Sequence, residues 1–226
     1  GTLLSAKHLA NSGVGTFGIA AALCSHNIET LHCTDISMSE HLNYKMLLGT
    51  DVTVSLMPID NVTLEILKNH TRAAAESMAF TLYRTAHSTF VKETEDFTTG
   101  LTTPEGETFA TPTELGATWF VGLNYGRAIR MIDDYKPGDI CMTNDPYSGF
   151  VCTHPPDMHI WKPIFYGDEI VAFSVGHIHN TDVGGAVPAS ISRTLSEIHQ
   201  EGIRIPPTKI VRRGEFNKEV LDIMLT

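Results

Sequence analysis

The stretch from Asn144 to Gly185 concentrates histidines and aspartates among glycines, prolines and short apolar runs. Imidazole and carboxylate groups together suit Mn, Fe and Zn, and a set of two histidines and one carboxylate leaves coordination positions open for a substrate. A solvated surface has no need of this combination. The composition of the stretch therefore predicts a metal site, and the rest of the chain is expected to position it.

Two short patterns supply the candidate ligands. His154 and Asp157 lie three residues apart, and the prolines between them favour a stiff turn, which holds two ligands in fixed geometry. His177 and His179 alternate by two, so on a strand they point to the same face. Asp182 follows closely, and a carboxylate beside a ligating histidine often orients it. A lone histidine usually packs in a core, but two clusters that each pair histidine with aspartate favour a metal site.

Other residues of this region have weaker claims to chemistry. Asp145 stands at a predicted strand end, where turn formation explains it as well as a functional role does. His159 and Trp161 fit packing better than chemistry. His199 and Glu201 stay ambiguous.

Several catalytic templates fail on this sequence. A Ser-His-Asp triad around Ser148 is disfavoured, because no Gly-x-Ser-x-Gly turn surrounds the serine. Neither a Walker lysine motif nor an H-E-x-x-H pair is present. The glycines of residues 13–18 resemble a phosphate loop only weakly, and we interpret them as a turn. His26, His32 and Cys33 could bind a metal, but nothing beside them completes a set.

Composition narrows the class of protein. The chain has 226 residues, of which 42% are hydrophobic and 19% charged, as in globular proteins. A net charge of −10 disfavours nucleic acid as a partner, and no apolar run is long enough for a membrane span. The N-terminus lacks the pattern of a signal peptide. The four cysteines form no C-x-x-C pair, so we expect reduced thiols in a cytoplasmic protein.

The first readable element is a long helix. Asp60 or Asn61 is a suitable N-cap, and a helical stripe of apolar residues follows that we expect to lie in the core: Leu64, Leu67, Ala74, Met78, Leu82 and Ala86. Residues 96–101 and 108–111 then read as strands joined by a turn at 104–107, and residues 115–132 as a second helix.

The second half alternates turns and strands. Residues 139–143 predict a short buried strand, and residues 160–165 and 169–175 a hairpin that carries His177 and His179 at its end. A final helix is expected to begin near Glu215. These elements predict a mixed α/β (α+β) fold with antiparallel or mixed sheets and packed helices. We expect a single main domain over residues 55–226, with residues 1–54 unassigned.

Seven short motifs occur in a recognisable order: Val62–Ile66, Lys92-Glu93 with Asp96-Phe97, Pro137-Gly138-Asp139, Asn144–Tyr147, Thr153-His154 with Asp157, Asp182–Gly185, and Gln200–Pro207. From about residue 60 to its end, the chain resembles the N-terminal part of the hydantoinase B/oxoprolinase family, which also contains the α subunit of acetone carboxylase. Members of that family continue beyond this point, so we expect the chain to be a fragment.

The resemblance implies a subunit of an ATP-dependent enzyme. A hydantoinase A-type partner would bind ATP and activate a carbonyl oxygen by phosphorylation, and this chain would supply a divalent metal: Mn, Zn or Fe. By motif, the resemblance implies His154, Asp157, His179 and Glu93 as metal ligands. His177 and Asp182 would support them or carry protons in catalysis.

The implied substrate is a cyclic amide, which the enzyme would hydrolyse. One alternative is an ATP-dependent ketone carboxylase, and another is a subunit whose metal is only structural. The chain departs from the commoner hydrolase pattern at Val151-Cys152, where two glycines are usual, and at Gly122-Leu123-Asn124 in place of His-Leu-Gly. Both differences bear on the choice between hydrolysis and carboxylation.

Overall fold

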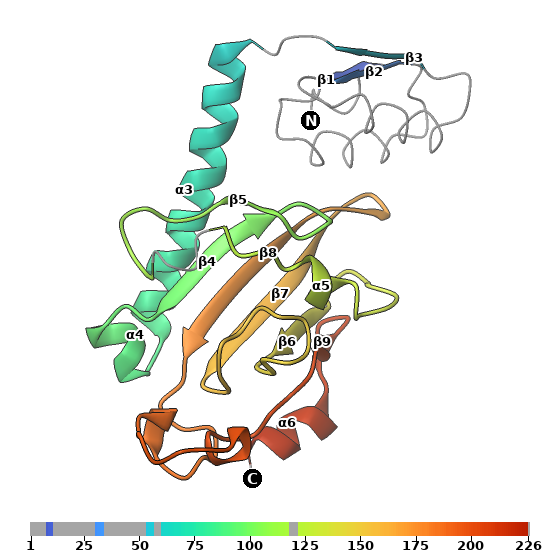
Figure 1. Cartoon of the computed structure of the whole chain (residues 1–226). Coiled ribbons are helices and arrows are strands. Elements are labelled where there is room, and N and C mark those ends of the chain that lie inside the picture. Colours follow the sequence, from blue (N-terminus) through green and yellow to red (C-terminus); the bar gives the residue numbers. More distant parts are fainter. Residues whose placement is uncertain (1–7, 11–29, 34–52, 57–59, 118–121, 226) are drawn as a thin grey trace. The chain divides into compact units, whose positions relative to one another are not determined.

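The computed structural model describes residues 8–10, 30–33, 53–56, 60–117 and 122–225 (Figure 1). The chain divides into two compact units: residues 1–70 with the hairpin tip 165–171, and residues 71–164 with 172–226. The predicted boundary at residues 54/55 stays a prediction. Among the described helices, none has the length and apolar character to cross a membrane.

The first unit contains a small parallel sheet. Its strands are β1 (His8–Ala10), β2 (Thr30–Cys33) and β3 (Thr53–Leu56), in that order. His32 and Cys33 are therefore strand residues. The predicted turn at residues 13–18 and His26 lie outside the described residues.

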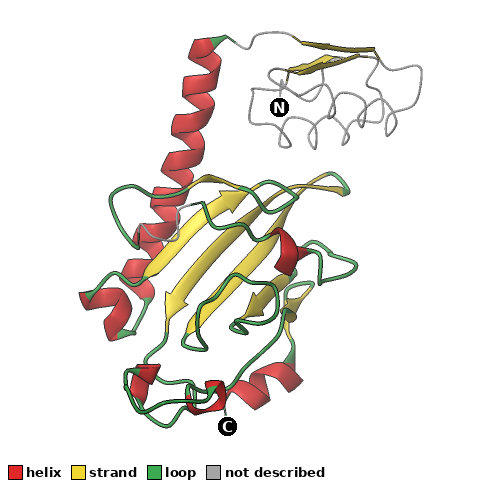
Figure 2. Cartoon of the chain, viewed as in Figure 1, coloured by secondary structure: helices red, strands yellow, loops and turns green. Residues whose placement is uncertain are grey.

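A seven-stranded sheet forms the centre of the second unit (Figure 2). Its strands β10 and β9, β9 and β6, β6 and β7, β8 and β4, and β4 and β5 pair antiparallel, which confirms the predicted mixed α/β fold. The strand order is β10-β9-β6-β7-β8-β4-β5. The strands are β4 (Phe97–Thr102), β5 (Thr108–Ala110), β6 (Ile140–Thr143), β7 (Asp157–Tyr166), β8 (Glu169–His179), β9 (Thr208–Arg212) and β10 (Glu215–Phe216).

The long helix α3 (Asn61–Thr85) begins where the sequence predicts. The carboxylate of Asp60 accepts hydrogen bonds from the backbone N–H groups of Val62 and Thr63, both at 3.0 Å, which is N-capping. Five members of the predicted core stripe are half-buried: Leu64, Leu67, Met78, Leu82 and Ala86. Ala75 and Ala79 are buried, whereas Ala74 is exposed.

The exposure of Ala74 has a simple cause. The run Ala73-Ala74-Ala75 offers the same side chain on three successive helix positions, so hydrophobicity alone does not fix the phase of the stripe. The packing that decides it is a core of Ala79 with Val91 and Phe97, joined by Leu82, Tyr83 and Ala86.

The predicted hairpins are confirmed. β4 pairs with β5 around the turn at residues 104–107, and β7, which ends at Tyr166, and β8 flank Gly167 and Asp168. A short helix, α4 (Thr89–Glu93), precedes β4. The last helix, α6 (Lys218–Met224), starts three residues later than predicted, because Glu215 and Phe216 pair with β9 as strand β10.

The predicted helix over residues 115–132 is wrong in the part that the structure describes. Only α5 (Gly126–Ile129) is helical there. Gly116 has a φ of 101°, which L side chains rarely adopt and which ends any helix at that point. Gly126 packs so closely on the carbonyl oxygen of Glu105 that an added Cβ would lie 2.1 Å from it. The segment therefore follows the β4–β5 turn instead of coiling.

Candidate metal centre

The ends of two neighbouring strands bring the candidate residues together. Asp157 is the first residue of β7, and His179 is the last residue of β8. Because β7 and β8 are antiparallel neighbours joined by a hairpin, the start of one lies beside the end of the other. His154 precedes Asp157 in a tight turn, in which the Asp157 N–H donates to the His154 carbonyl oxygen at 3.0 Å.

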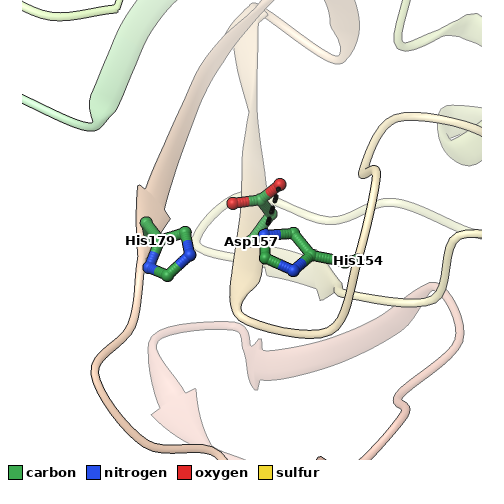
Figure 3. Close-up of side chains that lie close together, drawn as sticks. All are labelled: His154, Asp157 and His179. Carbon is green, nitrogen blue, oxygen red and sulfur yellow. Dashed lines mark ion pairs between the residues drawn. The ribbon is translucent and has the colours of Figure 1, made fainter. Parts of the chain in front are cut away.

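His154, Asp157 and His179 form a compact group. One potential ligand atom from each lies within 4.8 Å of the others, and Figure 3 shows the three side chains converging. Asp157 and His179 are buried, and His154 is half-buried. Imidazole and carboxylate donors in this number match a site for Mn, Fe or Zn with open coordination positions.

Asp157 is the most heavily contacted member of the group. Its Oδ1 lies 3.1 Å from Nε2 of His177, and its Oδ2 accepts a hydrogen bond from the Thr153 hydroxyl at 2.7 Å. Oδ2 also lies 3.5 Å from Nε2 of His154. Burial alone would raise the pKa of Asp157, but the contacts to His154, His177 and Thr153 hold it well below its usual range. The carboxylate is therefore ionised, as a metal ligand must be.

His154 is oriented from its far side. Its Nδ1 lies 3.2 Å from the Glu201 carboxylate and 2.9 Å from the Ser190 hydroxyl. A carboxylate that accepts from Nδ1 leaves the Nε2 lone pair facing Asp157, the arrangement that commonly orients metal-binding histidines. Burial opposes charge on His154, but Asp157 and Glu201 outweigh it and raise its pKa. A metal ion bound at Nε2 would compete with a proton for that nitrogen.

His179 is held by packing and by its backbone. Its ring centroid lies 4.3 Å from that of Phe90 and 5.1 Å from that of His154. Its N–H donates to the Asp96 carbonyl oxygen at 3.0 Å, and its own carbonyl accepts from the Ser88 hydroxyl at 2.9 Å. Burial lowers the pKa of His179. Its Nδ1 is buried with no hydrogen-bond partner among the described residues, so one polar atom of this group is left for a ligand.

Asn144 fixes the turn that carries His154. The side chain is fully buried, and its amide donates to the carbonyl oxygens of Pro155 and Ile203 at 2.7 and 2.8 Å. Its Oδ1 accepts from the Ile205 N–H at 2.7 Å. One amide therefore ties the ligand turn to the segment that follows Glu201. The sequence placed Asn144 in the functional stretch but did not indicate this clamp.

The group lines a pocket of about 450 Å³. Its walls are formed by Asp96, Leu123, Phe150, Val151, Cys152, Thr153, His154, Asp157 and His179. Cys152 is buried, and burial followed by the nearby charge of Asp157 raises its pKa to about 12, so the thiol stays protonated. Val151 and Cys152, where the resemblance leads us to expect two glycines, thus form part of the wall.

Two residues predicted for the site lie elsewhere. Glu93 is exposed at the C-terminal end of α4 and is outside the group. Asp182 is exposed, and its Oδ1 accepts the Gly184 N–H at 2.9 Å, which is a local turn contact. It lines a separate hollow with His199 and Ile203. Among the described residues, Asp96 lines the pocket beside Asp157, and the Glu201 carboxylate contacts His154.

Ser190, His154 and Asp157 have the residue types of a catalytic triad, and both Ser190 and Asp157 contact the His154 ring. Ser190 has a φ of 56°, an uncommon conformation for a residue other than glycine. Its hydroxyl, however, is not among the residues that line the pocket, and it shares Nδ1 of His154 with Glu201. This geometry favours an orienting role for Ser190 over a nucleophilic one.

Comparison with known proteins places the chain in a family. The model of the hydantoinase B/oxoprolinase family matches residues 60–226. The chain is 31% identical to the caprolactamase subunit beta of Pseudomonas jessenii over 74% of its own length and 29% of the relative's. It is 33% identical to a 5-oxoprolinase of Pestalotiopsis fici over 74% of the chain and 13% of that protein.

Two solved structures share the fold. The ATP-dependent caprolactamase of Pseudomonas jessenii superposes with a TM-score of 0.59 at 27% identity, over 74% of this chain and 29% of that one. A nucleotide-free acetone carboxylase superposes with a TM-score of 0.65 at 22% identity, over 73% and 22%. This chain belongs to the hydantoinase B/oxoprolinase family, of whose larger members it spans less than a third.

Proposed function

We propose that this chain carries the metal centre of an ATP-dependent enzyme that hydrolyses a cyclic amide. Its ligands are His154, Asp157 and His179. A hydantoinase A-type partner subunit binds ATP and phosphorylates the amide oxygen. When bound, the divalent metal supplies Lewis acidity at the activated carbonyl or phosphoryl oxygen.

The convergence of the three ligand side chains in one pocket carries this proposal. The donors fit a divalent metal: Asp157 is ionised, Nε2 of His154 faces Asp157, and a buried nitrogen of His179 has no partner among the described residues. Family membership supports the chemistry, since relatives bear the names caprolactamase and 5-oxoprolinase, both of which act on cyclic amides.

His177 and the pocket wall complete the centre. His177 contacts Asp157 rather than the pocket, so it acts on the ligand, and its predicted proton-carrying role would run through Asp157. Asp182 is exposed, accepts the Gly184 N–H and is not among the residues that line this pocket, so these contacts do not support its predicted role as a proton carrier. Val151, Cys152 and Phe150 bound the space left for the substrate.

A coupled assay tests the proposal. The chain is co-expressed with a hydantoinase A-type subunit, and ATP consumption and ring-opened product are measured for hydantoin, 5-oxoproline and caprolactam. We expect ATP-dependent ring opening that is lost in Asp157→Asn and kept in Glu215→Gln, which changes an exposed carboxylate of β10. Ring opening that survives Asp157→Asn at the wild-type rate would sink the assignment.

Ketone carboxylation is the second candidate. The fold shared with acetone carboxylase favours it, although that likeness concerns the fold alone. In the same assay, ATP consumption that requires a ketone and bicarbonate would select carboxylation over hydrolysis.

A structural role for the metal makes a different prediction. A structural metal supplies folding free energy, so its removal unfolds the protein. We expect the chelated protein to keep its far-ultraviolet circular dichroism spectrum, because Asp157 and His179 occupy only the ends of β7 and β8, and the core around Phe97 contains none of the metal ligands. Loss of that spectrum on chelation would favour the structural alternative.

A further inference from the structure

Three buried polar side chains, Tyr125, His159 and His177, form a chain of contacts that ends at Asp157 of the metal centre. Tyr125, His159 and His177 are 1%, 0% and 1% exposed, and none of them lines the pocket at the metal centre. Polar groups of this size are rarely fully buried unless a structural or functional need offsets their desolvation.

The contacts run in one direction, from Tyr125 to the metal ligand. The Tyr125 hydroxyl lies 2.9 Å from Nδ1 of His159. The His159 ring stacks on the His177 ring, with centroids 4.7 Å apart and an interplanar angle of 27°. His177 in turn places Nε2 3.1 Å from Oδ1 of Asp157.

The chemistry of these contacts assigns donors and acceptors. An ionised Asp157 only accepts, so Nε2 of His177 is the donor to Oδ1. The Tyr125 phenol keeps its proton because burial raises its pKa, and its hydroxyl forms a hydrogen bond with Nδ1 of His159. This hydrogen bond fixes the orientation of the His159 ring, on which the His177 ring stacks.

This inference rests on the proposed metal centre. We propose that His177 is a positioning residue, which holds Oδ1 of Asp157 so that Oδ2 is presented to the metal, and that the Tyr125–His159 pair locks the His177 ring in place. The alternative, simple packing, requires only shape and no hydrogen bond from residue 177. Groups that orient a ligand in this way typically contribute about 10- to 100-fold to metal affinity.

Two variants of His177 that differ by one methylene separate these roles. Glutamine has an amide donor that reaches Asp157, whereas the donor of asparagine falls short of it. Mn²⁺ affinity of the metal-free full chain is measured by calorimetric titration, with circular dichroism and thermal unfolding in chelator as folding controls. We expect His177→Asn to lower the affinity about 10- to 100-fold and His177→Gln to restore most of it.

Tyr125→Phe is the second arm. It removes only the hydroxyl, and we expect it to lower Mn²⁺ affinity in the same direction by less than about 10-fold, since it acts through two rings. If His177→Asn does not fold, the test rests on Tyr125→Phe. Reduced Mn²⁺ affinity of this variant supports the positioning role of the Tyr125–His159–His177 chain, and unchanged affinity overturns it.

The results separate the positioning role of His177 from the existence of the metal centre itself. Mn²⁺ binding by wild type with equal affinity in the folded asparagine variant overturns the positioning role and leaves the metal centre standing. Equal losses in the glutamine and asparagine variants also overturn it, because the donor would then not matter. No Mn²⁺ binding by folded wild type overturns the metal centre and the inference together.

Discussion

Two buried aspartates lie at opposite ends of the paired strands β6 and β7. Asp157 opens β7, while Asp139 immediately precedes β6, and the antiparallel register Cys141–Trp161 and Thr143–His159 keeps them apart. Both carboxyl groups have a lowered pKa. Their partners, however, differ in kind.

The carboxylate of Asp139 has its charge and hydrogen-bond partners within the protein. It pairs with Nζ of Lys209 at 2.8 Å and accepts the N–H groups of Arg213 and Lys136 at 2.8 and 2.9 Å. Asp157 meets imidazoles, of which His154 can exchange its proton for a metal ion. A lowered pKa therefore marks both a structural ion pair and a candidate functional site, and the identity of the partners separates the two.

The largest expected effect comes from Asp157→Asn. The change removes the charge that His154, His177 and Thr153 surround, and it removes a ligand. We expect Mn²⁺ affinity to fall by more than about 100-fold, since changes behind the ligands alone cost about 10- to 100-fold. Calorimetric titration measures it. Unaltered affinity would show that the two aspartates do not differ as described.

Asp139→Asn should affect stability instead. Breaking a fully buried ion pair costs roughly 3–5 kcal/mol, and we expect about 2 kcal/mol here because Lys209 keeps some contact with water. Urea unfolding measures the loss. Mn²⁺ affinity of the folded variant should equal that of wild type, and a large drop in affinity would tie Asp139 to the metal centre.

Glu201→Gln tests how much the carboxylate that contacts His154 contributes to metal binding. The glutamine amide can still contact His154, but it lacks the negative charge of the carboxylate, which favours a proton on Nδ1. We expect a loss of about 10-fold in Mn²⁺ affinity, at the lower end of the range for such orienting groups. Glu215→Gln, at an exposed position on β10, is the matched control and should bind like wild type.

The smallest effect concerns acid stability. The pKa of Asp139 is lower in the folded state than its usual 3.8, so its contribution to stability is fully present above that value and is lost as the pH falls through the folded pKa. The difference in unfolding free energy between wild type and Asp139→Asn should therefore be constant near neutral pH and shrink in acid. A difference that grows in acid would reverse the sign assigned to this pair.

Local patterns predicted most of the elements that position the site. Asp60 capped its helix, the hairpin delivered His177 and His179, and the proline turn held His154 near Asp157. Each of these features depends on residues close in sequence, where capping and alternation act directly.

The features that the sequence did not predict depend on contacts between segments that are distant in the chain. Glu201 reaches His154 from 47 residues away, and no local pattern indicates that contact. The helix predicted around Gly126 failed because the glycine packs on Glu105, which only the fold brings near. Glu93 was assigned from a family motif and Asp182 stands three residues after His179, yet the short helix α4 and a local turn leave both exposed.

Elemental analysis of protein purified without chelators tests the central claim most directly. The account predicts about one Mn, Zn or Fe per chain in wild type, bound by His154, Asp157 and His179, and little or none in Asp157→Ala. A folded wild type without metal, or a variant that retains the full complement, would contradict the assignment of this pocket as a metal centre.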